Sequence, residues 1–200
     1  MPDFALEAAA GGLVAGVDEA GRGPWAGPVV AGAAILNPAI MPEELLGRLD
    51  DSKKLAANVR EQLFDGLQEH AITAVGIASV AEIDSLNILV ATMLAMCRAV
   101  EALPVSPDTA LVDGNRAPAL SCRVRTVVKG DSRSSSIAAA AIVAKVTRDR
   151  IMAGLAGDFP GYGWETNQGY GTAAHRDGLD RLGVTIHHRR SFKPIASRIK

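Results

Sequence analysis

Short apolar runs that end in acidic residues are the sequence feature that most restricts what this chain can fold into. The first run covers 13–17 and ends in Asp18, with Gly21 close behind as a turn residue. Later runs end at Asp113 and shortly before Asp131. Runs this short, rich in Val, Leu and Ala, are typical of buried strands. The chain is therefore expected to build a sheet that carries carboxylates at several strand ends.

Strands come first in the sequence, and helices then alternate with further strands. This order favours a mixed sheet flanked by helices, in the α/β class. The strands are expected at 13–17, 28–36, 71–78, 109–113 and 123–129. The helices are expected at 51–70, from a Ser79–Glu82 capping box in one long helix to Val100, at 134–155 and at 175–182.

One domain is the expected organisation, because the 200 residues contain no repeat and no low-complexity linker. Hydrophobic residues make up 48% and charged residues 22%, which excludes a disordered, collagenous or coiled-coil chain. Aromatic residues are only 4%, so the core must consist mostly of Ala, Val, Ile and Leu. Cys97 and Cys122 have no metal-ligand spacing, which excludes a disulfide framework and fits a reducing compartment.

The sequence predicts neither a targeting segment nor a membrane span. Asp3 and Glu7 precede every basic residue, unlike the start of a signal peptide. The uncharged run 23–42 has the length of a membrane helix. Its four prolines and three glycines argue against such a helix. We therefore expect a cytoplasmic protein.

The formal net charge of −1 hides an uneven distribution of charge. Residues 1–51 hold eight acidic and two basic side chains, whereas 115–150 hold eight basic and two acidic ones. Residues 185–200 hold five basic side chains and no acidic one. Basic segments attract a polyanion, and acidic ones can bind a cation. Charge alone favours the alternative that most of these side chains are ordinary solvated surface.

Four carboxylates stand at or after strand ends beside glycine: Asp18, Glu19, Asp113 and Asp131. Grouped at one sheet edge they would repel one another, and a hard divalent cation such as Mg²⁺ would neutralise them. The alternative is that acidic residues beside glycine simply form turns. Adjacent strand residues also point to opposite faces. Asp18 and Glu19 can therefore share one site only if the strand breaks there or one contributes its carbonyl.

Eight short motifs follow one another in register over nearly the whole chain. They are GVDEAGRGP at 16–24, DSKKL at 51–55, NIL with ATM at 87–93, VDGN at 112–115, VKGD at 128–131, AKVTRD at 144–149, GYGT with a histidine at 169–175, and HRRSF at 188–192. Together they resemble the signature of bacterial ribonuclease HII. One such motif is weak evidence, but eight in order are highly specific.

The resemblance implies a ribonuclease H-like fold, a mixed five-stranded sheet flanked by helices with a small C-terminal helical extension. We expect one catalytic domain over 1–200, whose helical and basic part at about 156–200 contributes to substrate binding. The implied activity is endonucleolytic hydrolysis of the RNA strand of RNA–DNA hybrids. It includes incision 5′ to single ribonucleotides embedded in duplex DNA, leaving 3′-hydroxyl and 5′-phosphate ends. Nothing requires an oligomer, so a monomer is expected, and no protein partner is indicated.

The resemblance also implies roles for individual residues. The catalytic and metal-binding residues would be Asp18, Glu19, Asp113 and Asp131. They would hold two Mg²⁺ or Mn²⁺ ions, one activating the attacking water and the other stabilising the leaving oxygen. The turn Gly21, Arg22 and Gly23 would read the ribonucleotide and Tyr170 the neighbouring sugar. The remaining substrate-binding candidates are Lys53, Asn115, Lys145 and Arg190, the last within a basic cluster at 189–193.

Each of these roles has an ordinary structural alternative. Without the resemblance, Arg22 would be expected to form a salt bridge beside Asp18, and Tyr170 to be an aromatic residue of a surface loop. His175 is expected to make a structural hydrogen bond, and the adjacent histidines 187–188 do not suggest a metal site. Serines 134–136 are expected to begin a helix rather than to supply a nucleophile.

Two departures from related proteins bear on the interpretation. Ala141 stands where ribonucleases HII commonly carry a serine, which would alter substrate binding if that hydroxyl touches substrate. Only about a dozen residues precede the motif at 16–24, whereas the sibling ribonuclease HIII has a sizeable N-terminal substrate-binding domain. Type HII is therefore expected.

Three other functions are possible from the sequence alone. A nuclease of the same fold with another substrate, such as a junction resolvase, is disfavoured by the Gly-Arg-Gly turn and Tyr170. A catalytically dead module that only binds ribonucleotides is disfavoured because all four acidic positions are intact. A small-molecule α/β enzyme lacks support because the chain has no GxGxxG or Walker motif.

Overall fold

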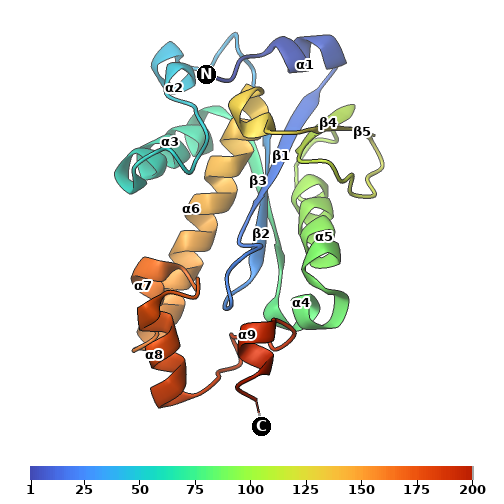
Figure 1. The fold of residues 1–200 in the computed structure, drawn as a ribbon. Helices are drawn as coiled ribbons and strands as arrows, with labels where there is room; N and C mark the ends of the chain where they lie inside the picture. The colour runs from blue at the N-terminus through green and yellow to red at the C-terminus, as the bar shows by residue number, and fades with distance from the viewer. Residues whose placement is uncertain (200) are drawn as a thin grey trace.

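A five-stranded mixed sheet in the order β3-β2-β1-β4-β5 forms the centre of the computed structural model, which describes residues 1–199 (Figure 1). The strands are β1 (Val14–Ala20), β2 (Val29–Ile35), β3 (Ile72–Ala78), β4 (Thr109–Asp113) and β5 (Arg123–Val127). The first three pair antiparallel, and β4 lies parallel to both β1 and β5. The predicted mixed sheet is confirmed. Lys200, part of the predicted basic C-terminal segment, lies outside the described residues.

The long helix α6 (Ser135–Asp158) covers one face of the sheet and contacts β1 and β2 (Figure 1). Gly16 and Gly32 permit this close approach. A Cβ atom at Gly16 would lie 2.0 Å from the backbone carbon of Ser136, and one at Gly32 would lie 2.3 Å from the Ala140 carbonyl oxygen. The helix that carries Lys145 and Arg148 is therefore fixed against the strand that carries Asp18.

The opposite face of the sheet is covered by α5 (Ile88–Glu101), which follows α4 (Val80–Leu86). The predicted capping box is present, because Ser79 and Glu82 each bond the other's backbone N–H group. The prediction of one long helix is wrong. Asn87 has a φ of +71° and its side chain caps α5, so the chain breaks between the two helices although the apolar spacing continues across them.

The remaining helices have different bounds from those expected. They are α1 (Ala5–Ala10), α2 (Glu43–Gly47), α3 (Ala57–His70), the single 3-10 turn η1 (Gly130–Ser132), α7 (Trp164–Asn167), α8 (Ala173–Leu182) and α9 (Lys193–Ala196). The helix expected from residue 51 begins only at Ala57, and 51–56 form a loop. The strand expected to reach Lys129 ends at Val127, because Lys129 has a left-handed φ of +55°.

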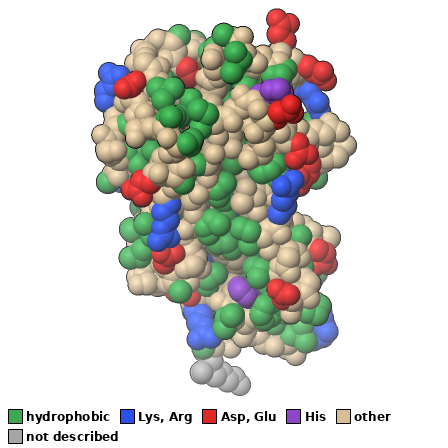
Figure 2. All heavy atoms as spheres, turned by 180° about the vertical axis from the view of Figure 1, so that it is seen from behind, with side chains coloured by type: hydrophobic (Ala, Val, Ile, Leu, Met, Phe, Trp, Pro, Cys, Tyr) green, Lys and Arg blue, Asp and Glu red, His purple; other side chains and the backbone are tan. Residues whose placement is uncertain are grey.

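The helices α7 and α8 lie beside the far end of α6, and α9 lies below the sheet (Figure 1). They share a small core with the loop after β1, in which Ala26, Met152, Trp164 and Ile195 are buried. On the face seen in Figure 2, acidic and basic side chains are interspersed. Within residues 1–199 no helix has the length and apolar character needed to cross a bilayer.

Candidate active site

A cavity of about 470 Å³ opens where β1 ends. Its walls come from the end of β1, the turn after it, the loop before α3, the middle of α6 and the segment before α8. The lining residues are Asp18, Glu19, Ala20, Gly21, Arg22, Gly23, Ser52, Lys53, Arg60, Lys145, Arg148 and Tyr170. Eight of the twelve predicted site residues are among them. Asp113, Asn115, Asp131 and Arg190 are not.

Strand pairing brings three of the predicted carboxylates together. The register pairs Val17 with Val112, so Asp18 lies beside Asp113, the last residue of β4, at the point where the pairing of these two parallel strands stops. The Asp113 Oδ1 atom accepts a hydrogen bond from the Gly130 amide at 2.7 Å. Asp131, the next residue, lies in η1 just beyond β5. The cluster is therefore built by the pairing of β1 with β4 and by the contact between Asp113 and η1.

Burial and the repulsion of neighbouring carboxylates raise the pKa values of Asp18, Glu19 and Asp131. The pKa of Asp18 lies well above its usual value, first because of burial and then because of Glu19, Asp113 and Asp131. Burial also raises the pKa of Glu19, against an opposing ion pair with Arg22 at 3.4 Å. Burial raises the pKa of Asp131 as well. Bound positive charge would remove this cost of keeping the group ionised.

β1 remains regular through Ala20, which pairs with Val30 of β2. The strand break that would have let Asp18 and Glu19 share a site is therefore absent, yet both residues line the cavity. Within residues 1–199, no three Asp, Glu, His or Cys side chains form a ready-made metal cage. An open set of carboxylate oxygens suits Mg²⁺ or Mn²⁺, because such ions use few carboxylates and keep waters in their remaining positions. The donor set therefore fits these cations.

Lys53 supplies positive charge beside the carboxylates. Burial lowers the pKa of its ammonium group, but Asp18, Asp131, Asp51 and Asp113 together raise it above the usual value. Lys53, predicted from the sequence only as a substrate-binding residue, therefore lies close to the acidic cluster. The position of Lys53 depends on the conformation of the loop 51–56 that carries it.

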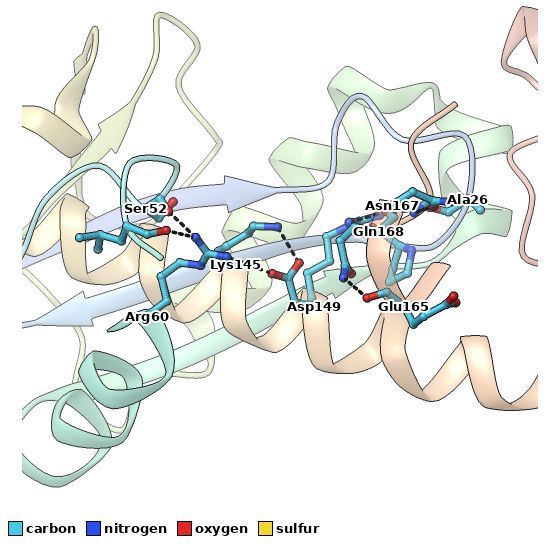
Figure 3. Close-up of polar contacts among 12 residues, drawn as sticks. Ala26, Ser52, Arg60, Lys145, Asp149, Glu165, Asn167 and Gln168 are labelled. Atoms are coloured by element: carbon cyan, nitrogen blue, oxygen red, sulfur yellow. Dashed lines mark hydrogen bonds and ion pairs between the residues drawn. The ribbon is translucent and has the colours of Figure 1, made fainter. Parts of the chain in front are cut away.

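Arg60 of α3 holds that loop. Its Nη1 donates to the Ser52 carbonyl at 3.0 Å and to the Leu55 carbonyl (Figure 3). Its Nη2 lies 3.8 Å from Asp149 of α6, whose other carboxylate oxygen accepts a 2.7 Å bond from Lys145. Lys145 is therefore tied to the loop through a shared carboxylate. Sequence analysis missed Arg60 and Asp149, and only a spatial arrangement joins these distant motifs.

The Gly21–Gly23 turn and Tyr170 lie against each other. A Cβ atom at Gly23 would be 3.3 Å from the Tyr170 ring, and the ring residue is 49% exposed. Arg22 pairs with Glu19 rather than with Asp18, the partner considered from the sequence. An exposed ring beside a glycine turn forms one continuous wall of the cavity.

Two buried arginines behind this wall were missed by sequence analysis, although both belong to recognised motifs. Arg148 and Arg189 are 1% and 0% exposed. The sequence favoured Arg190, but Arg190 is exposed and its backbone amide bonds Asp84 of α4 at 3.0 Å. Asn115 is likewise exposed beyond β4.

His175 has the structural role expected of it. Its Nδ1 bonds the Tyr170 carbonyl at 3.0 Å, and its Nε2 meets Trp164 Nε1 and His188 Nε2, each at 3.1 Å. The His188 Nδ1 accepts a bond from the Thr185 amide at 2.9 Å. Each ring therefore carries one proton, His175 on Nδ1 and His188 on Nε2. Burial above all, followed by the other two histidines, lowers the pKa of His188 to about 3.

The helix start and the alanine substitution have simple structural accounts. Ser134 caps α6, accepting a bond from the Ile137 amide at 3.1 Å, as expected of a helix-starting serine. Ala141 is buried in α6 and does not line the cavity. The missing hydroxyl therefore leaves the cavity wall unchanged.

The sequence profile of the family described as Ribonuclease HII matches residues 15–195. The chain belongs to the ribonuclease HII family. It is 61% identical over 196 residues to Ribonuclease HII of Paramagnetospirillum magneticum, covering 98% of both chains. It is 59% identical to Ribonuclease HII of Rhodospirillum rubrum, covering 98% of this chain and 90% of that one. The crystal structure of ribonuclease H2 from Pyrococcus horikoshii matches with a TM-score of 0.76 at 29% identity, covering 92% and 95%.

Membership of the ribonuclease HII family defines the reaction. The protein is a metal-dependent endoribonuclease that hydrolyses the RNA strand of RNA–DNA hybrids and incises DNA at embedded ribonucleotides. Its cofactor is a divalent cation, Mg²⁺ or Mn²⁺. This assignment favours the nuclease over the binding module and the small-molecule enzyme considered from the sequence.

Proposed function

We propose that Asp18, Glu19, Asp113 and Asp131 bind the divalent cations of this ribonuclease HII, and that the Gly21–Gly23 turn with Tyr170 selects the ribonucleotide. One observation carries the proposal. The cavity is lined by two carboxylates of the cluster, Asp18 and Glu19, and by a glycine turn with an exposed aromatic ring beside it. The carboxylates suit metal-dependent hydrolysis of a phosphodiester, and the glycine turn with its aromatic ring suits recognition of a sugar.

The four carboxylates occupy different positions around the expected cations. Asp18 is buried at the centre of the cluster, and Asp113 is oriented by the Gly130 amide. When bound, the divalent cations supply charge that stabilises the attacking and leaving oxygens of the phosphodiester. Lys53 and Lys145 line the same cavity and are suited to contact phosphates on either side of the scissile bond. The chain itself chiefly positions the substrate.

Ribose selection is assigned to the backbone of the turn. Within residues 1–199, the Arg22 and Gly23 amides donate to no other group, and both residues line the cavity. Free amides beside a glycine can approach a 2′-hydroxyl, the group that distinguishes RNA from DNA. The Tyr170 ring is suited to stack on the adjacent deoxyribose, where an extra hydroxyl would clash. This arrangement favours incision 5′ to the ribonucleotide, with 3′-hydroxyl and 5′-phosphate products.

The C-terminal part, at about 156–200, belongs to the substrate-binding machinery in this proposal. It supplies Tyr170 to the cavity wall and Arg189 to the turn.

The test is a panel of four end-labelled substrates in Mg²⁺ and in Mn²⁺. The panel comprises a DNA duplex with one ribonucleotide, a long RNA–DNA hybrid, an all-DNA duplex and a four-way DNA junction. The proposal predicts one cut 5′ of the single ribonucleotide, cleavage of the hybrid, and intact all-DNA substrates. Cleavage of the junction, or a cut at the 3′ side of the ribonucleotide, would contradict it.

A further inference from the structure

Two fully buried guanidinium groups, those of Arg148 and Arg189, lie behind the glycine turn without an acidic partner. Within residues 1–199, no carboxylate comes within 4.0 Å of either group. Burying a cation in this way is costly unless its donors are all satisfied. Burial lowers the pKa of Arg148 to about 10 and that of Arg189 to about 9, so both remain charged at neutral pH. Such an arrangement calls for an explanation beyond ordinary packing.

Arg189 satisfies its donors with the carbonyl groups of the turn. Its Nη2 donates to the Gly21 carbonyl at 2.5 Å and to the Pro28 carbonyl at 3.1 Å. Its Nη1 bonds the Arg22 carbonyl at 3.0 Å, and its Nε bonds the Gly27 carbonyl at 2.9 Å. One planar side chain therefore fixes both ends of the loop that joins β1 to β2.

Arg148 holds the same loop from α6. Its Nε donates to the Pro28 carbonyl at 3.0 Å and its Nη2 to the Ala26 carbonyl at 3.1 Å. Its Nη1 reaches the Gln168 carbonyl at 3.0 Å, two residues before Tyr170. Ala26 and Gln168 lie at the same end of the close-up in Figure 3. Arg148 thus ties the turn to the segment that carries the exposed ring.

Gly21 leaves room for the guanidinium group of Arg148 because it has no side chain. Its φ is +99°, and a Cβ atom there would lie 2.1 Å from Arg148 Nε. The glycine thus provides both the backbone angle and the space for the guanidinium. Because the carbonyls of Gly21 and Arg22 face Arg189, the orientation of the Gly21–Gly23 peptides is determined by that side chain.

We propose that Arg189 and Arg148 are positioning residues for ribonucleotide selection, which fix the turn so that the Arg22 and Gly23 amides face the sugar. This inference rests on the proposed function of the turn. The guanidinium donors of both arginines are taken up by backbone carbonyls, although Arg148 also lines the cavity. They act through the backbone, so a change in either should affect the chemical step at ribose more than duplex binding.

The experiment compares Arg189→Lys and Arg148→Lys with the wild-type protein. Lysine keeps the charge but cannot reproduce a planar fork that bonds several carbonyls. The kcat and KM values are measured on a DNA duplex with one ribonucleotide, per folded molecule and well below each variant's Tm. An uncleaved all-DNA duplex serves as competitor and reports binding of the phosphate backbone. Arg98→Lys is the matched control, because Arg98 also bonds a backbone carbonyl, that of Ile77, but lies outside the cavity.

The expected result for Arg189→Lys is a kcat at least tenfold lower, with KM and the competitor's Ki within about threefold of wild type. Arg148→Lys should behave alike, and Arg98→Lys should match wild type. Equal kcat values in wild type and both lysine variants would overturn the inference, as would a loss confined to KM and Ki. If the wild-type protein itself fails to cut the ribonucleotide duplex, the proposed function fails instead.

A wild-type measurement covers the case in which the variants do not fold. Nuclear magnetic resonance can follow exchange of the Arg148 and Arg189 Nε protons with water. Both protons are hydrogen-bonded and buried, so their signals should persist long after those of exposed arginines are lost. Exchange as fast as that of the exposed Arg181 would overturn the inference.

Discussion

The Asp113 carboxylate accepts a hydrogen bond of 2.7 Å from the Gly130 amide, and this bond joins the end of β4 to η1, the turn that follows β5. It orients one carboxylate of the cluster and holds the neighbouring Asp131 close by. Repulsion from both residues contributes to the raised pKa of Asp18. This backbone contact therefore helps to hold Asp113 and Asp131 close to Asp18, where the three carboxylates can bind a cation.

Asp113→Asn should abolish cleavage without unfolding the protein. The amide oxygen of asparagine can still accept the Gly130 bond, but the negative charge is lost. We expect activity to fall at least about 100-fold, with affinity for the hybrid largely intact. Cleavage assays and binding by fluorescence anisotropy measure the two effects. Asp113→Ala, which also loses the bond, should lower Tm further. Wild-type activity in the asparagine variant would contradict a ligand role for Asp113.

Divalent cations should stabilise the folded protein through the same carboxylates. A ligand that binds only the folded state adds about 2.7 kcal/mol at 100 times its Kd. For a chain of this size, each kcal/mol is roughly 2–4 °C in Tm. Thermal unfolding with and without Mn²⁺ should therefore show a higher Tm for wild type and a much smaller rise for Asp18→Asn. Equal rises in both proteins would place the cation elsewhere.

Tyr170 should act through its ring rather than its hydroxyl group. The ring lies beside Gly23 and is half exposed. Tyr170→Ala should reduce selectivity for the RNA–DNA junction by roughly tenfold, because stacking contributes about 1–3 kcal/mol. Tyr170→Phe should retain the selectivity. The ratio of cleavage at the junction to cleavage within the RNA tract measures the effect. An unchanged ratio in the alanine variant would show that stacking plays no part.

His188 should make stability depend on acid pH. Its pKa is about 3 in the folded state, against about 6.5 in an unfolded chain. Between these values the unfolded chain takes up a proton that the folded protein does not. Stability should therefore fall as pH decreases from about 6.5, by at most about 1.4 kcal/mol per pH unit from this group. Urea unfolding at pH 7 and pH 5 measures the change.

The matched variant for this prediction is His188→Gln, whose side-chain amide can still donate toward His175 but cannot titrate. The raised pKa values of Asp18 and Glu19 make the protein more stable as pH falls, which opposes the effect of His188. The loss of stability must therefore be compared between His188→Gln and wild type. The loss of stability from pH 7 to pH 5 should be smaller in His188→Gln than in wild type. His70→Gln, at a partly exposed histidine outside this cluster, should match wild type. Identical losses in all three proteins would contradict a buried neutral His188.

The acidic cluster could be predicted from the sequence because the pairing of β1 with β4 brings two of its residues together. Asp18 and Asp113 each follow an apolar run, and parallel neighbours end at the same edge of a sheet. The helix break at Asn87 could not be predicted from periodicity, since apolar spacing continues across it. The preference of asparagine for helix caps and left-handed angles was the available signal.

The supporting arginines could not be predicted from the sequence for a different reason. Arg189 and Arg190 are neighbours in one motif, and only the packing of the 21–28 loop decides which side chain is buried. Arg60 and Asp149 meet across 89 residues of chain, a contact to which neither local propensity nor charge pattern points. The acidic residues could therefore be predicted from the sequence, whereas the side chains that orient the loops around them could be identified only from the structure.

The most direct test is to locate the cation itself. Crystals grown with Mn²⁺ give an anomalous scattering signal at each bound ion. The account predicts a peak between Asp18 and Asp113, at about 2.0–2.3 Å from carboxylate oxygens of both. A strong peak elsewhere on the protein, with none between these two residues, would contradict the central claim.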